Sequence, residues 1–396
     1  MEFVAYDSIL LKLVLNYTDA GVTVKTKGLL SPFLRKVEKK FDTYTKAIPA
    51  EIRGDRLYLS TTFPPIPSKP FKRLVFSQIK RALGIHTPDN LTVMVTGDCQ
   101  CHCEHCLAYK MDGGEELSKN EIFSVIDQAL ELGTSQITFE GGEPTLRKDL
   151  PELIEHVDKN KVTSMVVTNG QYLTKDYVQE LKECGLDYIN VSIDSPYLGE
   201  HDKFRGISGL FEDATEGIKN SVDAGILTGV LYIARPGNCD RETLEKMVNY
   251  CEELGVFELM IDKIVPSGRW TGKNVLSEEQ EEEIIRFQKE IAEKKGKNLI
   301  TNFFQLRRPN FFGCFAGRRW LYVSPTGEVM PCMHTPVSFG NVREEKLSKI
   351  WKKIRKHPLF SKKPKKCAHE DPEYKENYLK NIPDNTPLPY PIKEHD

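Results

Sequence analysis

The feature that most constrains this chain is a regular alternation of strand-like and helix-like stretches from about residue 91 to residue 296. Short apolar runs bounded by turn residues alternate with longer stretches whose apolar residues recur every three or four positions. The six apolar runs are residues 91–96, 136–143, 163–170, 188–195, 227–235 and 257–265. The helical stretches are residues 118–133, 148–160, 174–185, 211–225, 241–255 and 277–296.

Six strand–helix units in a row imply parallel strands joined by right-handed crossovers, which is an α/β fold. Six units are fewer than the eight of a closed barrel. The sequence therefore predicts a partial (β/α)6 barrel, and a doubly wound sheet is the alternative.

The two ends of the chain lack this rhythm. A basic helix-like segment at 31–48, an alternating pattern at 51–63 and a Pro-rich segment at 64–73 predict a small α+β lead-in with a linker. Residues 318–332 predict a hairpin that turns at "SPTGE", the start of a C-terminal hairpin-and-helix extension. We divide the chain into a lead-in at 1–88, the barrel at 89–300, the extension at 301–370 and an extended tail at 371–396.

The composition limits where such a protein works. The chain has ten cysteines, yet it shows no secretory signal and no apolar run long enough to span a membrane. We expect a cytoplasmic protein, in which clustered cysteines bind metal or act in catalysis more often than they form disulfides. A net charge of −2 makes nucleic acid an unlikely partner. The basic stretch 343–366 favours a solvated helix face; its functional alternative is a patch for an anionic membrane surface or a phosphate-bearing substrate, which would make the protein peripheral at the membrane.

Four unusual loops follow the first four predicted strands. "VTGDCQCHCEHCLAYK" (95–110) packs four cysteines together, and "GGEP" (141–144), "TNG" (168–170) and "SIDS" (192–195) end the next three runs. The carboxyl ends of parallel strands share one rim, where α/β proteins place their sites. Disulfides, zinc, an iron–sulfur cluster and chance are the candidate explanations for the cysteines. Zinc on four thiolates usually needs two well-separated pairs, which this loop lacks.

The spacing CxxxCxxC of Cys99, Cys103 and Cys106, followed by "GGEP", "TNG", "SIDS" and "KFRG", resembles the radical S-adenosylmethionine (radical SAM) enzymes over about residues 89–270. In that family three cysteines hold a [4Fe–4S] cluster whose fourth iron binds SAM. The resemblance implies that these three cysteines are ligands and that Cys101 is a packed small residue or a thiol near the site. The SAM contacts that it implies are Gly141, Gly142, Glu143, Pro144, Asn169, Ser192, Asp194 and Arg205.

The chemistry of these residues suits the implied roles. The two glycines would let the backbone approach a ligand closely. Glu143 would accept hydrogen bonds from the amino group of SAM, while Ser192 and Arg205 would hold its carboxylate.

A second set of cysteines lies beyond the barrel. Cys314, Cys332 and Cys367 resemble the C-terminal SPASM or shorter twitch extension, which carries auxiliary [4Fe–4S] clusters. The full SPASM pattern has more cysteines than the three found here, so at most one auxiliary cluster fits. Its fourth ligand would be His334, His369, the substrate or nothing; the alternative is that these cysteines are structural. Cys184, Cys239 and Cys251 fall at or near predicted helices and are expected in the core.

The resemblance implies an enzyme that cleaves SAM to methionine and a 5′-deoxyadenosyl radical, which abstracts a hydrogen atom from a substrate. It implies an electron donor such as ferredoxin or flavodoxin, and an auxiliary cluster that accepts an electron or binds substrate. The substrate classes in view are a peptide, a cofactor precursor and a lipid, and no catalytic base is singled out. The rival class is a non-catalytic iron–sulfur carrier or sensor, against which "GGEP", "SIDS" and "KFRG" argue.

Overall fold

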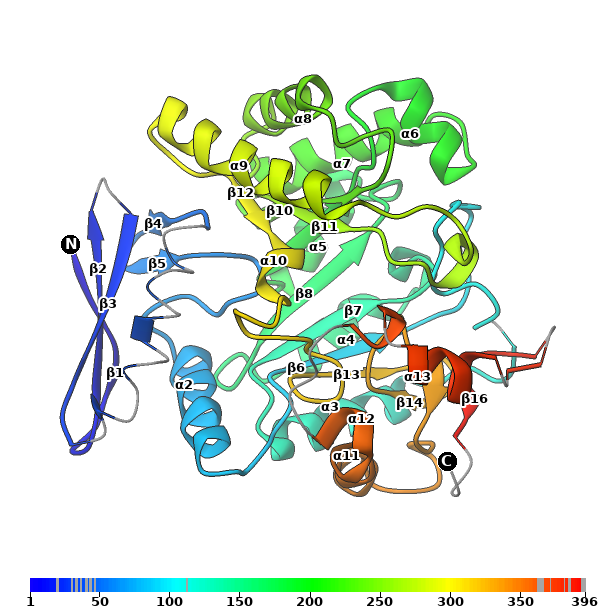
Figure 1. The fold of residues 1–396 in the computed structure, drawn as a ribbon, viewed down its shortest axis with the longest axis horizontal. Helices are drawn as coiled ribbons and strands as arrows, with labels where there is room; N and C mark the ends of the chain where they lie inside the picture. The colour runs from blue at the N-terminus through cyan, green and yellow to red at the C-terminus, as the bar shows by residue number, and fades with distance from the viewer. Residues whose placement is uncertain are drawn as a thin grey trace.

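A computed structural model describes the chain except residues 19–20, 30, 33–34, 36–37, 40–41, 43–44, 46–47, 112, 362–366, 371, 381, 384–385 and 393–396. Its centre is a nine-stranded sheet with helices along its outer face (Figure 1). The parallel strands are β6 (Asn90–Met94), β7 (Gln136–Glu140), β8 (Thr163–Thr168), β9 (Tyr188–Ser192), β10 (Leu227–Ala234), β11 (Glu258–Lys263) and β12 (Ile300–Asn302). The helices between them are η1 (Pro144–Leu146), α3 (Lys119–Leu132), α4 (Leu150–His156), α5 (Lys175–Glu183), α6 (Leu198–Arg205), α7 (Leu210–Asp223), α8 (Arg241–Glu253), η2 (Gly268–Trp270) and α9 (Glu278–Lys295).

The sheet is open, because β12 forms one edge and the hairpin strand β14 (Val329–Met330) forms the other. The prediction of an α/β fold with six strand–helix units in an open, partial barrel is confirmed. β12 adds a seventh parallel strand that the sequence analysis missed, since its three residues are too few to show a period.

Local signals in the sequence set the helix ends. Ser118 caps α3 and forms a reciprocal capping box with Glu121, and the helix ends at Gly133 in the left-handed conformation (φ 107°). α9 begins with the equivalent box between Ser277 and Gln280. Such caps satisfy backbone donors that have no partner within the helix.

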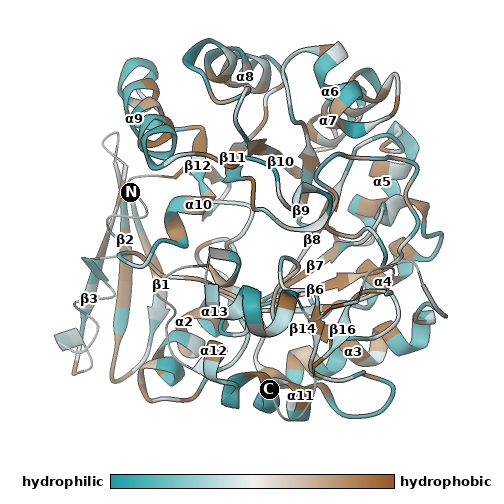
Figure 2. Cartoon of the chain, turned by 45° about the vertical axis from the view of Figure 1, so that its right-hand side comes forward, coloured by the Kyte–Doolittle hydropathy of each residue, from teal (hydrophilic) through white to brown (hydrophobic). Residues whose placement is uncertain are grey.

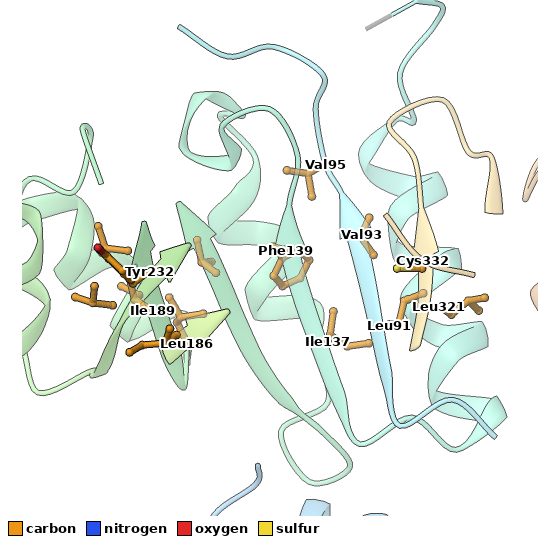
Figure 3. Packing of buried hydrophobic residues seen from close by; sticks show 14 of the residues in the cluster. Leu91, Val93, Val95, Ile137, Phe139, Leu186, Ile189, Tyr232, Leu321 and Cys332 are labelled. Carbon is orange, nitrogen blue, oxygen red and sulfur yellow. The ribbon is translucent and has the colours of Figure 1, made fainter. Parts of the chain in front are cut away.

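The main core lies between the sheet and the outer helices. Val93, Phe139, Ile189 and Tyr232 are fully buried there, and Leu321 from the C-terminal hairpin packs in the same cluster (Figure 3). The strands are mainly hydrophobic, while the helices α8 and α9 present hydrophilic residues outward (Figure 2). Burial of this continuous apolar cluster is the main stabilising contribution to the barrel.

The N-terminal region forms a separate small sheet beside the barrel (Figure 1). The small sheet consists of β1 (Glu2–Asp7), β2 (Lys12–Thr18) and β3 (Gly21–Lys27). The same region contains the hairpin of β4 (Glu51–Arg53) and β5 (Arg56–Tyr58), and the helix α2 (Lys69–Ala82). Thus the predicted small α+β segment is present, although the helix predicted at 31–48 falls largely outside the described residues.

One loop of this region packs against the amino-terminal end of the barrel. The buried carboxylate of Glu258 on β11 accepts hydrogen bonds from Ser60 Oγ (2.7 Å), Thr61 N–H (2.8 Å) and Thr61 Oγ1 (2.7 Å). Gln136 Nε2 donates to the Thr61 carbonyl oxygen (2.8 Å). Because a buried carboxylate needs such donors, the loop and the barrel stabilise each other.

The C-terminal extension begins by joining the central sheet. β13 (Trp320–Val323) runs parallel to β6 and antiparallel to β14, so the predicted hairpin is confirmed. The boundary that we predict between residues 300 and 301 falls inside β12. The remaining elements are α10 (Phe303–Leu306), β15 (Val337–Ser338), α11 (Leu347–Lys356), α12 (Pro358–Ser361) and η3 (Ala368–Glu370).

The tail at 371–396 differs from the extended segment that the sequence predicts. Its described part is helical at α13 (Pro372–Tyr374) and η4 (Lys375–Leu379), because Tyr374 is completely buried and stacks on Tyr378 with ring centroids 5.5 Å apart. Further on, β16 (Tyr390–Pro391) pairs with β15. Within the described residues no helix has the length and hydrophobicity to cross a bilayer.

Candidate active site

The cysteine-rich segment forms an irregular loop directly after β6, and two other segments hold it in place. His102 N–H donates to the Arg205 carbonyl oxygen (2.8 Å) at the end of α6. Arg269 N–H in η2 donates to the Cys106 carbonyl oxygen (3.1 Å). Backbone contacts at both ends therefore fix the loop over the rim of the sheet.

All four cysteines of this loop, Cys99, Cys101, Cys103 and Cys106, line one cavity. Cys101 lies between Cys99 and Cys103 and hydrogen-bonds to both sulfurs. Its backbone N–H also donates to Cys99 Sγ (3.4 Å), and Asn169 Nδ2 donates to Cys101 Sγ (3.5 Å). Of the two roles considered for Cys101, the structure fits a thiol beside the site.

Electrostatics favour thiolates at two of these positions. The hydrogen bond from Cys101 lowers the pKa of Cys103 to about 6, and the Arg205 guanidinium, with Nη1 3.9 Å from Cys103 Sγ, contributes to the shift. The hydrogen bond from Cys101 lowers the pKa of Cys99 as well, whereas burial raises the pKa of Cys106. Thiolate is the form that binds metal.

Gly141 and Gly142 follow β7 and lie against the cysteine loop. A Cβ on Gly141 would lie 2.3 Å from the Thr96 carbonyl oxygen, and one on Gly142 would lie 2.1 Å from the Asp98 carbonyl oxygen. The N–H of Gly142 donates to that Thr96 oxygen over 2.7 Å. These positions require glycine because their backbone lies against the loop that carries the cysteines. The sequence had instead suggested that the glycines make room for a ligand.

Glu143 joins two rim loops. Its Oε1 accepts hydrogen bonds from Thr145 N–H (3.1 Å) and Thr168 Oγ1 (2.6 Å), and its Oε2 accepts one from Asn169 N–H (2.8 Å). Burial raises the pKa of this carboxyl, and the hydrogen bonds oppose that shift. Pro144 is buried and begins η1. The carboxylate therefore organises "GGEP" and "TNG", and Oε2 retains capacity for one more donor.

Asp194 and Arg205 form a buried ion pair at the fourth rim loop. Arg205 Nε donates to Asp194 Oδ2 over 2.6 Å. Burial would raise the pKa of Asp194, but the charge of Arg205 outweighs it and the pKa is lowered. Asp194 Oδ1 has no hydrogen-bond partner among the described residues. Asp194 therefore orients the Arg205 guanidinium, while Ser192, at the end of β9, lines the cavity directly.

These loops meet around one cavity of about 880 Å³. Of the eight predicted SAM contacts, six line it and two, Pro144 and Asp194, lie behind its wall. The six are Gly141, Gly142, Glu143, Asn169, Ser192 and Arg205. The sequence order of strands and helices thus brings the four rim loops together as expected.

One residue of this site, Glu140, was missed in the sequence. Glu140, the last residue of β7, lines the cavity, and burial raises its pKa to about 7. Its signal was the alternation in "QITFE", because Gln136, Thr138 and Glu140 share one face of the strand and all line the cavity. His105, which we expect from the sequence to be a packing or surface residue rather than a ligand, stacks on Phe204 with ring centroids 4.7 Å apart.

The second cysteine set also converges. Cys314 hydrogen-bonds to Cys367, and Cys332 lies close enough to Cys367 for their charges to interact. The buried Arg307 guanidinium interacts with all three. His334 and His369 both lie at this site: His369 Nε2 bonds the His334 carbonyl oxygen, and His334 Nδ1 lies 2.8 Å from Ser267 Oγ.

The donor sets can be tested against the groups that they would hold. No three His, Cys, Asp or Glu side chains in the described part of the chain converge closely enough for a single metal ion. A cubane cluster instead binds each cysteine through a different iron, so its ligands surround a volume rather than a point. The thiols of Cys99, Cys103 and Cys106 surround such a volume, with the Arg205 guanidinium 3.9 Å from Cys103 Sγ, and Cys101 is a fourth thiol beside them. This arrangement fits a cluster and does not fit mononuclear zinc.

Comparisons with known proteins agree with this geometry. Two family models match: one described as the radical SAM superfamily over residues 93–251, and one, SPASM, described as an iron–sulfur cluster-binding domain over residues 314–369. The chain is similar to an AdoMet-dependent heme synthase of Nitratidesulfovibrio vulgaris, at 29% identity over 65% of this chain and 77% of the relative. It is also similar to a PqqA peptide cyclase of Granulibacter bethesdensis, at 28% identity over 67% and 74%.

Solved structures share the fold over nearly the whole chain. Streptococcus suis SuiB bound to its precursor peptide SuiA aligns with a TM-score of 0.60 at 14% identity, covering 91% of this chain and 90% of SuiB. SuiB bound to S-adenosylmethionine aligns equally well, covering 91% and 89%. At this identity the likeness is one of fold.

Proposed function

Because the chain belongs to the radical SAM superfamily and carries a SPASM domain, we propose that Cys99, Cys103 and Cys106 hold the [4Fe–4S] cluster at which SAM binds. The protein is a radical SAM enzyme, and its cofactors are SAM and [4Fe–4S] clusters. When bound, the cluster supplies the electron that cleaves SAM to methionine and a 5′-deoxyadenosyl radical, which takes a hydrogen atom from the substrate. The observation that carries the proposal is the convergence of these thiols with three rim loops on one cavity.

The rim residues would bind and orient SAM. Glu143 Oε2 would accept one hydrogen bond from the amino group in addition to that from Asn169 N–H. Arg205 Nε is engaged by Asp194, so its terminal nitrogens would hold the carboxylate beside the Ser192 hydroxyl. Asp194 would act by keeping the guanidinium in place.

We further propose that Cys314, Cys332 and Cys367 hold an auxiliary cluster. His334 lies at this site and also lines the cavity, so the cluster would be adjacent to bound substrate and able to accept an electron from it or to contact it. A reductant of the ferredoxin or flavodoxin class would supply the electron for SAM cleavage. The names of the relatives, heme synthase and PqqA peptide cyclase, favour a cofactor precursor or a peptide as the substrate class. The third class considered, a lipid, is not supported by these names.

Iron content tests the ligand assignment. Anaerobically reconstituted protein should hold about eight iron atoms per chain, as expected for two cubane clusters. Replacing Cys99, Cys103 and Cys106 by Ala should remove about half of the iron and abolish SAM cleavage, while Cys184→Ala, a change outside both sets, should alter neither. Full iron content in the triple variant would refute the assignment. Iron-loaded wild-type protein that leaves SAM intact would instead indicate a non-catalytic carrier.

A further inference from the structure

The cavity extends well beyond the rim that would hold SAM. Its volume of about 880 Å³ is near the upper end of the range for ligand pockets, about 300–1,000 Å³. The part farthest from the cysteines is walled by side chains of the N-terminal sheet and α2, namely Leu11, Leu13, Val24, Leu74, Val75 and Ile79. SAM at the rim would leave this far part for another molecule.

The cavity wall also carries aromatic side chains. Phe303 stacks on Trp320 with ring centroids 5.4 Å apart, and Phe315 meets Trp320 edge-on at 5.1 Å. Phe303 and Phe315 belong to the segment between β12 and β13, and Trp320 is the first residue of β13. An apolar chain laid along them would be removed from water without losing hydrogen bonds.

The charged groups in the far part have partners, although the buried Nε of Arg81 has none among the described residues. Asp89 pairs with Arg81 (3.0 Å) and Arg319 (2.8 Å), and Glu38 accepts a hydrogen bond from Thr26 Oγ1 (2.6 Å). A peptide backbone here would bring polar groups that need new partners, which is unfavourable in an apolar setting. The far part therefore favours a hydrocarbon chain over a peptide.

The far part reaches the surface beside exposed apolar residues. Ala82, which is exposed, lines its end, and the next residues in the chain include Leu83 (74% exposed) and Ile85 (55%). Leu11 lines the same part, and it follows Ile9 (98%) and Leu10 (47%) in the β1–β2 turn. Both the β1–β2 turn and the end of α2 lie at the lower side of the molecule in Figure 1.

The same side carries positive charge. α11 also lies at the lower side in Figure 1, and it buries Leu347, Ile350, Trp351 and Ile354 while its lysines are exposed. Two of these lysines, Lys349 and Lys353, pair with Glu345; three others that are exposed are Lys346, Lys352 and Lys356. Apolar tips beside exposed lysines are the combination that binds anionic lipid surfaces.

We propose that the substrate is a membrane lipid, whose hydrocarbon chain enters beside α2 and the β1–β2 turn and extends along the aromatic wall to the SAM site. The chemistry in this proposal rests on the proposed function, whereas the binding surface and the channel are inferred from the contacts described above. The occupant of the exposed surface is an anionic phospholipid leaflet.

Vesicle binding tests the surface. The reconstituted full chain should co-sediment with vesicles of phosphatidylcholine and phosphatidylglycerol about tenfold more strongly than with phosphatidylcholine alone. Replacing Leu83 and Ile85 by Ser should weaken that binding about tenfold or more, while Leu198→Ser, at another exposed apolar position, on α6 (46% exposed), should not. Equal binding by the double variant and the wild type, or no binding by either, would overturn the proposal.

A fluorescent fatty acid, dansyl-undecanoic acid, tests the channel. It should bind the reconstituted enzyme, and Val75→Trp and Ile79→Lys should each weaken the binding about tenfold or more, by filling the channel or by placing a charge in it. SAM cleavage measured in the same samples shows whether the variants remain folded at the rim. Unchanged probe affinity in both variants overturns the lipid channel. Loss of SAM cleavage in the wild type with intact probe binding would instead count against the proposed function alone.

Discussion

Replacing Gly142 by Ala tests whether contact between two rim loops supports the cluster site. The new Cβ would lie 2.1 Å from the Asp98 carbonyl oxygen, where at least about 3 Å is normal, so the loops must separate by about 1 Å. Two backbone hydrogen bonds of 2.7 Å cross this contact, Gly142 N–H to Thr96 and Glu143 N–H to Asp98. Overpacking costs about 1–3 kcal/mol and each hydrogen bond about 0.5–1.5 kcal/mol, so we expect a loss of about 2–6 kcal/mol.

The assay is urea unfolding of the metal-free protein, with iron content measured after reconstitution. Gly142→Ala should lower the free energy of unfolding by that amount and reduce the iron bound at the first site. The matched control is Gly199→Ala, because nothing lies within 4 Å of a Cβ there and Ala is favoured over Gly in a helix such as α6. A Gly142→Ala loss below about 1 kcal/mol with normal iron content would refute the reasoning.

Three further changes probe single contacts. Cys101→Ser should leave iron content and SAM cleavage nearly unchanged, and loss of either would make Cys101 a ligand. Arg205→Lys keeps the positive charge but loses the bidentate hydrogen-bonding geometry of the guanidinium. SAM affinity should therefore fall about ten- to hundred-fold in equilibrium binding while iron content is unchanged. Unchanged affinity would show that Arg205 does not bind SAM. Glu258→Ala leaves the donors of Ser60 and Thr61 unpaired and should lower the free energy of urea unfolding by about 3–5 kcal/mol, more than Glu258→Gln does. Equal losses of unfolding free energy in Glu258→Ala and Glu258→Gln would contradict a stabilising role for these hydrogen bonds.

The sequence was sufficient for the features that depend on local pattern. Strand–helix alternation predicted the parallel sheet because each unit shows its own apolar period. The cysteine spacing and the three following loops predicted one rim, because parallel strands place their carboxyl ends together. The cavity there brings six of the eight predicted SAM contacts together.

The features that the sequence did not reveal depend on contacts between distant segments. Three such contacts are the ion pair of Asp194 with Arg205, the position of Cys101 between the Cys99 and Cys103 thiols, and the hydrogen bonds from Thr61 to Glu258. None of them produces a periodic pattern in the sequence. The sequence suggested that Gly142 leaves room for a ligand, because no local pattern shows that the Asp98 backbone lies there instead. The helical turn at Tyr374 depends on a burial site supplied by other elements.

The pairing of β13 with β6 also has a consequence for the order of synthesis. The ribosome produces β6 and the cysteine loop early, yet the strand that covers the open side of β6 emerges only when Trp320–Val323 has been made. Until then β6 is an uncovered sheet edge that can pair with other chains. We therefore expect the edge of β6 to be covered only after Trp320–Val323 has been made, and a chain truncated before Trp320 should aggregate.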